Sequence, residues 1–268
     1  MSESRLEILI AAYGEAGLKR IVATDPPRVE GVEYTVSWQQ PKGEIPSALA
    51  ERDDFRILKF YTKGSSTNHN HAIDAARGEI LLMADDDQKY TPESLRSIIK
   101  EFDSHPECDF LTFRFSTDGP AKFYPCESFD WRKPPKGAYV STIEMAVRRS
   151  SLTPDTRFDE NFGVNCPFAC GDDQVFLHNL LKAGLKGRFI PMDICFHPGD
   201  TTGSRLSMAV MAEAKGAMFM KLHPLSWPLR MLAHARRSGS PLAYCRHWLR
   251  GARRLRRLHS HRSPEPRP

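Results

Sequence analysis

The residues most able to do chemistry are three consecutive aspartates, Asp85, Asp86 and Asp87, which follow an apolar run at residues 80–84. Five apolar residues in a row predict a buried strand, and adjacent carboxylates at its end repel one another unless a cation lies among them. Hard divalent ions take carboxylate oxygens as ligands and complete their coordination with water or phosphate. The triplet therefore indicates a site for Mn²⁺ or Mg²⁺, with a solvated acidic turn as the alternative.

Glycine-rich phosphate loops are absent from the sequence. There is no GxxxxGK[ST] segment, and residues 13–17 (YGEAG) lack the GxGxxG spacing. These absences argue against a P-loop NTPase and a dinucleotide oxidoreductase. The first strand is also followed by no lysine-bearing glycine loop, which argues against a nucleotidyltransferase. A metal that holds a nucleotide diphosphate directly suits chemistry in which the diphosphate leaves.

The elements that must position the aspartates alternate between strands and helices. Strands are expected at residues 6–12, 34–38, 55–61, 80–84 and 110–115, and helices at residues 14–23, 67–77 and 92–103. This alternation predicts an α/β fold with an open, mostly parallel sheet and helices on both faces. Such sheets bind ligands at the carboxyl ends of their strands, which is where the aspartates lie.

The second half of the sequence is less regular. Residues 118–136 predict an irregular, lid-like loop, and residues 139–148 fit either a strand or a helix. Further on, we expect a helix at 174–183, two short strands at 189–191 and 194–196, and a helix at 207–222.

Four segments, taken in order, resemble the inverting glycosyltransferases of family 2, which have the GT-A fold. Residues 66–87 are similar to the family's helix, apolar strand and DxD motif, and residues 158–163 (FDENFG) with 171–177 (GDDQVFL) resemble its "FDE.FG … GED..FL" block. Residues 194–198 and 215–219 are similar to its C-terminal elements. The resemblance covers about residues 5 to 222.

The resemblance implies metal and catalytic roles. Asp85 and Asp87 are similar to the DxD carboxylates near the ribose and the metal, and His197 to a third metal ligand of some members. Asp173 is similar to the base that removes the acceptor proton, with Asp172 as the other carboxylate of the pair. The alternatives are a buried structural histidine at 197 and simple helix capping by Asp173.

The resemblance also implies a nucleotide-sugar site. Residues 38–40 (WQQ) replace the Asp-Gly-Ser that the family often has after its second strand, and the amide of Gln39 could still pair with a uracil edge. At position 69 a histidine replaces the usual arginine. The expected donor-binding residues are Ala12, Tyr13, Glu15, Gln39, Asn70, Asp85, Asp86 and Arg205.

The implied activity is inverting transfer of a hexose from a nucleotide-diphosphate sugar, with UDP expected, to a hydroxyl of a glycan or lipid-linked acceptor. The implied setting is bacterial surface polysaccharide biosynthesis. The alternative is a non-catalytic nucleotide-sugar or glycan binding protein on the same fold. Such a protein would need Asp85 and Asp87 but not Asp173, so the intact segment 171–173 favours the enzyme.

Composition agrees with a soluble globular protein, because 40% of the 268 residues are hydrophobic and 26% are charged. No apolar run is long enough to span a membrane, and no signal peptide is evident, so a cytoplasmic location is expected. The six cysteines are irregularly spaced and are expected to be reduced thiols.

Charge divides the chain at residue 223. Residues 224–268 contain eleven Arg, no Lys and one acid, whereas residues 1–223 carry the remaining 27 basic and 32 acidic side chains. We therefore expect a glycosyltransferase domain at 1–223 and a basic, amphipathic or partly disordered tail at 224–268. Apolar residues interleaved with Arg suggest two short helices on the anionic inner face of the cell membrane. A solvated tail is the alternative, and nucleic-acid binding is the least favoured.

Overall fold

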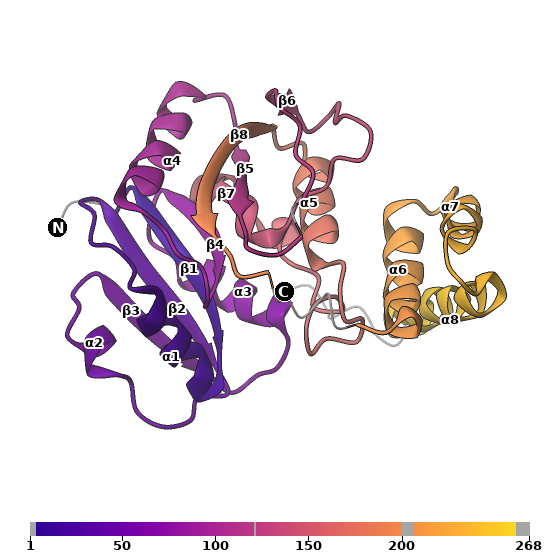
Figure 1. Ribbon diagram of the computed structural model, residues 1–268, viewed down its shortest axis with the longest axis horizontal. Helices are drawn as coiled ribbons and strands as arrows, with labels where there is room; N and C mark the ends of the chain where they lie inside the picture. The colour runs from indigo at the N-terminus through magenta and orange to yellow at the C-terminus, as the bar shows by residue number, and fades with distance from the viewer. Residues whose placement is uncertain (1–3, 121, 200–205, 261–268) are drawn as a thin grey trace, which may run out of the picture.

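The computed structural model describes residues 4–120, 122–199 and 206–260 (Figure 1). The described residues form an eight-stranded sheet with the order β3-β2-β1-β4-β7-β5-β8-β6. Its strands are β1 (Leu6–Tyr13), β2 (Val32–Gln39), β3 (Phe55–Phe60), β4 (Ile80–Asp85), β5 (Phe110–Ser116), β6 (Phe129–Asp130), β7 (Met145–Arg148) and β8 (Gly187–Phe196). Strands β1 to β4 are parallel, β8 is parallel to β5, and β6 and β7 run antiparallel to their neighbours. The expected mostly parallel sheet is confirmed.

Helices cover both faces of this sheet. The helices packed on it are α1 (Gly14–Thr24), α2 (Ser47–Ala50), α3 (Ser65–Ala75), α4 (Pro92–Ser104) and α5 (Asp172–Lys182). They are followed in the chain by α6 (Met208–Leu222), α7 (Trp227–Ala235) and α8 (Pro241–Ser260). Because strand side chains alternate between faces, Leu82 packs with α1 and α4, whereas Leu81 and Met83 pack with α3 and α5. The aspartates that follow β4 are therefore held at the end of a strand buried from both sides.

The structure decides one segment that the sequence left open and corrects another. Residues 139–148, for which strand and helix were both open, contain a single 3₁₀ turn (Thr142–Glu144) and then β7, inserted antiparallel between β4 and β5. The two short strands expected at 189–191 and 194–196 are one continuous strand, β8. Pro191 has no backbone N–H to donate to a neighbouring strand. It is tolerated within β8 because the pairing with β5 changes register between Thr112 and Arg114, so no ladder hydrogen bond is required from residue 191.

A buried carboxylate fixes where β4 starts. Glu7 on β1 is fully buried and accepts hydrogen bonds from Arg56 on β3 (2.9 Å) and from the backbone N–H groups of Arg77 and Gly78 (2.6 Å each). A Cβ at Gly78 would lie 2.7 Å from the Glu7 Cβ, so glycine is required for this approach. The network ties β4 to β1 and β3 at the end opposite the aspartates.

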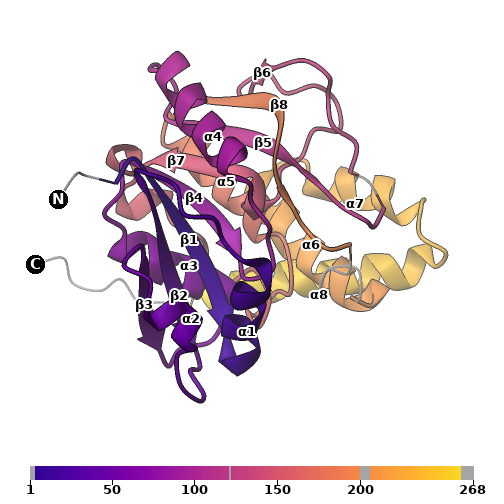
Figure 2. The ribbon, with the colours of Figure 1, turned by 60° about the vertical axis from the view of Figure 1, so that its left-hand side comes forward.

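Helices α6, α7 and α8 form a lobe at one end of the molecule (Figure 1), and the turned view shows α7 and α8 beside α6 (Figure 2). The apolar side of α8, with Tyr244, Trp248 and Leu255, packs on α6. A Cβ at Gly216 would lie 2.0 Å from the carbonyl oxygen of Trp248, so the two helices cross at backbone contact. The expected two helices are confirmed, and this packing crosses the predicted boundary at residue 223. No helix within the described ranges has the length and apolar character needed to cross a membrane.

Candidate active site

The aspartate triplet forms a tight turn directly after β4. Gln88 holds this turn, because its side-chain oxygen accepts hydrogen bonds from the Asp85 backbone N–H (3.2 Å) and from the Tyr90 hydroxyl (2.8 Å). The three carboxylates then separate into different environments, which gives each a different chemistry.

Asp86 is held by an arginine. The Arg20 guanidinium on α1 donates to both carboxylate oxygens of Asp86, at 2.6 and 2.7 Å. Desolvation raises the pKa of Asp86, and the Arg20 hydrogen bonds and charge oppose that rise. Both oxygens are thus occupied by a protein cation, which agrees with a secondary role for Asp86 toward a metal.

Asp87 faces His197. Their Oδ1 and Nε2 atoms lie 3.4 Å apart, and both side chains are mostly buried. His197 is placed there by β8, because its backbone N–H donates to the Ser116 carbonyl (2.9 Å) and Lys89 pairs with Phe196 in an isolated bridge. Asp87 Oδ1 and His197 Nδ1 are both buried without a hydrogen-bond partner. A buried carboxylate oxygen that accepts no hydrogen bond is explained by a bound cation.

These residues fit a partial metal site. Among the described residues, no three His, Cys, Asp or Glu side chains are grouped closely enough to form a complete cage. Asp87 and His197, with Asp85 nearby, would supply a few ligands and leave the remaining positions to phosphate oxygens and water. That division suits Mg²⁺ or Mn²⁺ bound together with a diphosphate.

Asp85 lies on the floor of the cleft, with its side chain 47% exposed. Desolvation, followed by the charges of Asp87, Asp86, Asp172 and Asp173, raises the pKa of Asp85 to about 8. The buried His69 has its Nε2 3.8 Å from Asp85 Oδ1. Burial lowers the pKa of His69 to about 4, so His69 is neutral at pH 7 and contributes no positive charge to this cluster of carboxyl groups. This concentration of negative charge favours binding of a cation.

A stack of three rings connects Asp85 to helix α5. The His69 ring lies on Phe158 with centroids 4.9 Å apart, and Phe158 lies on Phe176 of α5 at 3.9 Å. The stack joins α3, the loop before α5 and α5 itself behind the cleft.

Asp172 and Asp173 occupy the first turn of α5. Gly171 precedes them with φ of 101°, and a Cβ there would lie 3.0 Å from the Met218 sulfur of α6. Desolvation, then the charge of Asp172, raises the pKa of Asp173 to about 7, whereas the charge of Lys122 lowers it. Desolvation also raises the pKa of Asp172. A carboxyl group with a pKa near 7 is suited to general-base catalysis at neutral pH.

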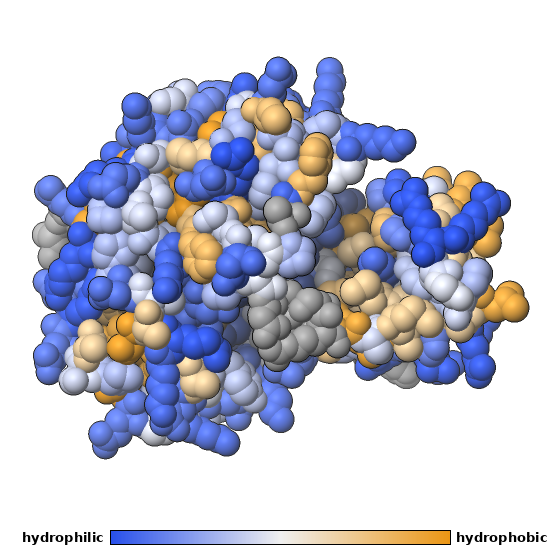
Figure 3. Space-filling view, in the orientation of Figure 1, coloured by the Kyte–Doolittle hydropathy of each residue, from blue (hydrophilic) through white to orange (hydrophobic). Residues whose placement is uncertain are grey.

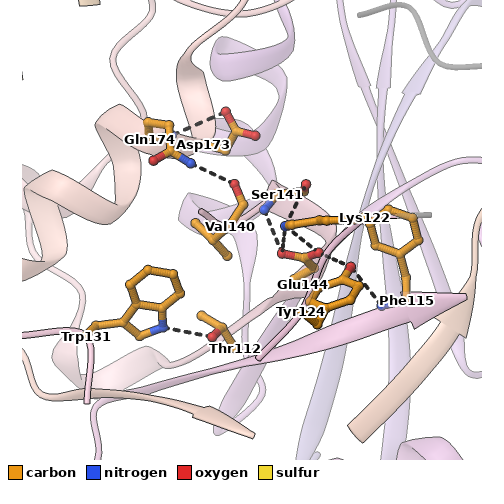
Figure 4. Close-up of polar contacts among 10 residues, drawn as sticks. All are labelled: Thr112, Phe115, Lys122, Tyr124, Trp131, Val140, Ser141, Glu144, Asp173 and Gln174. Atoms are coloured by element: carbon orange, nitrogen blue, oxygen red, sulfur yellow. Dashed lines mark hydrogen bonds and ion pairs between the residues drawn. The ribbon is translucent and has the colours of Figure 1, made fainter. Parts of the chain in front are cut away.

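A buried ion pair lies beside Asp173 (Figure 4). Lys122 Nζ contacts both Glu144 oxygens, at 2.6 and 2.7 Å, and Glu144 also accepts from the Tyr124 hydroxyl and the Ser141 N–H. Gln174, next to Asp173, donates to the Val140 carbonyl at 2.9 Å. These contacts fix residues 122–144 against the start of α5 and place a positive charge near Asp173. Lys122 and Glu144 were missed at the sequence level, because the loop that contains Lys122 has no periodicity.

The site residues line two adjoining clefts. One, of about 350 Å³, is lined by Asp85, Asp87, Asp172, Asp173 and His197, together with Cys170 and residues 141–143. The other, of about 420 Å³, is lined by residues that include Tyr13, Gln39, Ser65, Asn68 and Asp86. Asp85, Asp87 and Val164 belong to both walls. The DxD carboxylates therefore stand where the two clefts meet.

The structure places several expected donor residues away from these clefts. Ala12 is fully buried in the core, and Glu15 pairs with Lys19 on the exposed side of α1 (2.7 Å). The Asn70 amide donates to the Phe158 carbonyl (3.0 Å) and accepts from the Phe158 N–H (2.9 Å), which makes it a structural link. Arg205 lies outside the described residues.

Asn68 and Ser65 line the second cleft in place of Asn70. Residues three apart share one face of a helix, whereas Asn70 lies on another face of α3. Asn68 also donates to the Ala12 carbonyl (3.1 Å), which fixes α3 to the end of β1. The i, i+3 spacing of these polar residues was the available signal for the donor face.

Comparisons with known proteins agree with this geometry. The family described as "Glycosyl transferase family 2" matches residues 42–184, more than half of the chain. Among solved structures, S. aureus TarS 1–349 in complex with UDP-GlcNAc is similar with a TM-score of 0.59 at 14% identity, covering 87% of this chain and 71% of that one. TarS 1–349 alone gives 0.59 at 13% identity, with coverage of 97% and 93%. A longer TarS structure gives 0.55 at 15% identity, and only 42% of its length is covered.

At these identities the TarS structures establish the fold alone. No curated protein matches the chain. The family match and the mixed, mostly parallel sheet lead to one assignment: the chain belongs to family 2 of the glycosyltransferases and has the GT-A fold.

Proposed function

We propose that this protein is a metal-dependent, inverting glycosyltransferase that moves a sugar from a UDP-sugar to a hydroxyl of a glycan or lipid-linked acceptor. One observation carries the proposal. Two clefts meet at Asp85 and Asp87, and only one of them contains the candidate base Asp173. A donor in one cleft and an acceptor in the other would bring the anomeric carbon and the attacking hydroxyl together at that junction.

The donor half is the cleft with Tyr13 and Gln39. Tyr13 is 46% exposed at the end of β1 and offers a ring on which a uracil could stack. Gln39 lies on the adjacent strand β2, where its amide donates to Thr62 Oγ1 (3.1 Å) and to the Gly64 carbonyl (3.2 Å). UDP is supported by the UDP-GlcNAc bound to S. aureus TarS, whose fold this chain shares.

The diphosphate would lie beside Asp87, His197 and Asp85. The buried Asp87 oxygen that accepts no hydrogen bond, and the carboxylate charges gathered around Asp85, both favour a divalent cation there. When bound, Mn²⁺ or Mg²⁺ supplies positive charge that stabilises the departing diphosphate. Asp86 remains with Arg20, which adds a further cationic group near the phosphates.

Asp173 would act on the acceptor. Its carboxylate accepts the proton of the acceptor hydroxyl while that oxygen forms a bond to the anomeric carbon and the bond to the diphosphate oxygen breaks. Attack from the acceptor cleft reaches the sugar opposite the leaving group and inverts its configuration. The pKa of about 7 keeps Asp173 basic enough to take the proton and ionised enough to be available near neutral pH.

The test is release of UDP from a panel of UDP-sugars, with Mn²⁺, with Mg²⁺ and with a chelator. We expect turnover only with divalent metal, and loss of at least about a hundredfold in Asp87→Asn and His197→Ala. Asp155→Asn is the matched control, because Asp155 is exposed and lies outside both clefts. A UDP-induced rise in melting temperature without any turnover would instead support a non-catalytic binding protein.

A further inference from the structure

Helix α7 and the turns beside it expose four leucines, here named the leucine patch: Leu225, Leu229, Leu232 and Leu242. Their exposed fractions are 97%, 71%, 49% and 89%. Leu229 and Leu232 are spaced i, i+3 on α7, which places them on one side of that helix, and Leu225 lies in the turn that precedes it. Leu242 is the second residue of α8, just after the connection from α7. Apolar surface gathers over this lobe in Figure 3.

The leucine patch lies within a purely cationic segment. Residues 224–260 contain nine Arg and no Asp, Glu or Lys. Arg236 and Arg237 are exposed in the connection between α7 and α8, and Arg246 and Arg250 are exposed on α8. Arg254 is already engaged, since it pairs with Glu213 of α6 at 3.0 Å. A partner of this surface must therefore accept both leucine side chains and several positive charges.

The apolar side of α8 does not contribute to this surface. Trp248 and Leu255 are buried against α6, and the Gly216 crossing leaves no room between the helices. Among the described residues of this lobe, the four leucines are the most exposed large apolar side chains, and Met208 and Val210 of α6 follow at 42% and 41%. Because α6 also packs through Met218 on Gly171, which precedes Asp172 and Asp173, the lobe is joined directly to the catalytic helix.

We propose that α7 and the start of α8 bind the surface of an anionic lipid bilayer. The leucines would enter the boundary between headgroups and acyl chains, and the arginines would contact lipid phosphates. Charge complementarity favours an anionic partner, and the exposed leucines favour a lipid surface over nucleic acid, whose phosphate contacts use no apolar side chains. Bound in this way, the lobe would hold the catalytic unit at a membrane that carries a lipid-linked acceptor.

Co-sedimentation of the full chain with vesicles tests this proposal without any donor sugar. Vesicles of phosphatidylcholine are compared with vesicles that also contain phosphatidylglycerol. We expect binding to the anionic vesicles only, weakened by salt and reduced about tenfold or more in Leu225→Ser/Leu229→Ser/Leu232→Ser. Tyr61→Ser is the matched control, since Tyr61 is 77% exposed just after β3, outside the lobe, and its loss should leave binding unchanged.

The arginines are tested separately. Arg236→Gln/Arg237→Gln should weaken binding to anionic vesicles, and Arg236→Lys/Arg237→Lys should largely retain it. Circular dichroism and melting curves of each variant check that it is folded. Failure of the wild-type chain to sediment with anionic vesicles, or equal binding by the leucine variant, would overturn the proposal. So would leucine-dependent self-association or duplex DNA binding in place of vesicle binding, and none of these results depends on the glycosyl-transfer assay.

Discussion

The choice between Asp172 and Asp173 as the base can be decided by pH profiles of two single variants. The pKa of Asp173 is raised to about 7, first by desolvation and then by the charge of Asp172. With that value, about one eleventh of the wild-type enzyme has an ionised base at pH 6 and about ten elevenths at pH 8. We therefore expect kcat/KM for UDP release to rise about tenfold over this interval.

Removal of the neighbouring charge shifts this profile in a defined direction. In Asp172→Asn the carboxylate that raises the pKa of Asp173 is gone, so the acid limb should move to lower pH and the ratio between pH 8 and pH 6 should fall. In Asp173→Asn the base itself is gone, and kcat/KM should drop by about 10² to 10⁴ at every pH. UDP binding, followed by the rise in melting temperature, should persist in both variants. Abolished turnover in Asp172→Asn with only a shifted profile in Asp173→Asn would refute the assignment and reverse the two roles.

Three further predictions concern stability. The folded-state pKa of Asp85, about 8, exceeds the ordinary value, so the metal-free folded protein holds more protons than the unfolded chain between about pH 4 and pH 8. Its free energy of unfolding should fall as pH rises through this window, and urea unfolding of Asp85→Asn should show a smaller fall. Glu7→Ala should lower the free energy of urea unfolding by about 3 kcal/mol, because it leaves a partly buried Arg56 without its carboxylate. The control is Glu33→Ala, at the exposed register partner of Glu7 on β2, which should change this free energy by less than about 0.5 kcal/mol. Equal losses in the two variants would contradict a special role for Glu7. Gly216→Ala should lower the melting temperature through a cost of about 1–3 kcal/mol for the forced separation of α6 and α8, while Gly239→Ala, with nothing within 4 Å of the added Cβ, should not.

The parallel half of the sheet could be predicted from sequence because its signals are local. The apolar run before Asp85 is a buried strand whatever its neighbours are, and the alternation with helices leaves few topologies. Strand β7 could not be predicted in the same way. Residues 139–148 fit both periodicities, and only the gap between β4 and β5, filled by Met145–Arg148, selects the extended form.

The candidate site was predictable only where the role follows from position along the chain. The aspartates at the end of β4 and the pair at the start of α5 are of this kind. Asn68 and Asn70 are two residues apart on one helix, and the face that each presents depends on how α3 rotates against β1 and the loop at Phe158. Likewise, the sequence pattern of α8 predicts an apolar side but does not say which helix packs on it. The signal for that contact was the pair Gly216 and Gly251, because glycines permit two helix backbones to touch.

The stack of His69, Phe158 and Phe176 has a consequence for how donor and acceptor chemistry stay matched. Aromatic rings in contact resist compression, so the stack limits how closely α3, which carries His69 beside Asp85, can approach α5. A donor that displaces Asp85 would push on α5 through these rings, and one that leaves it in place would not. The same stack offers an engineering variable, because replacement of Phe158 by a residue of different thickness would change the distance from the proposed cation site to the proposed base.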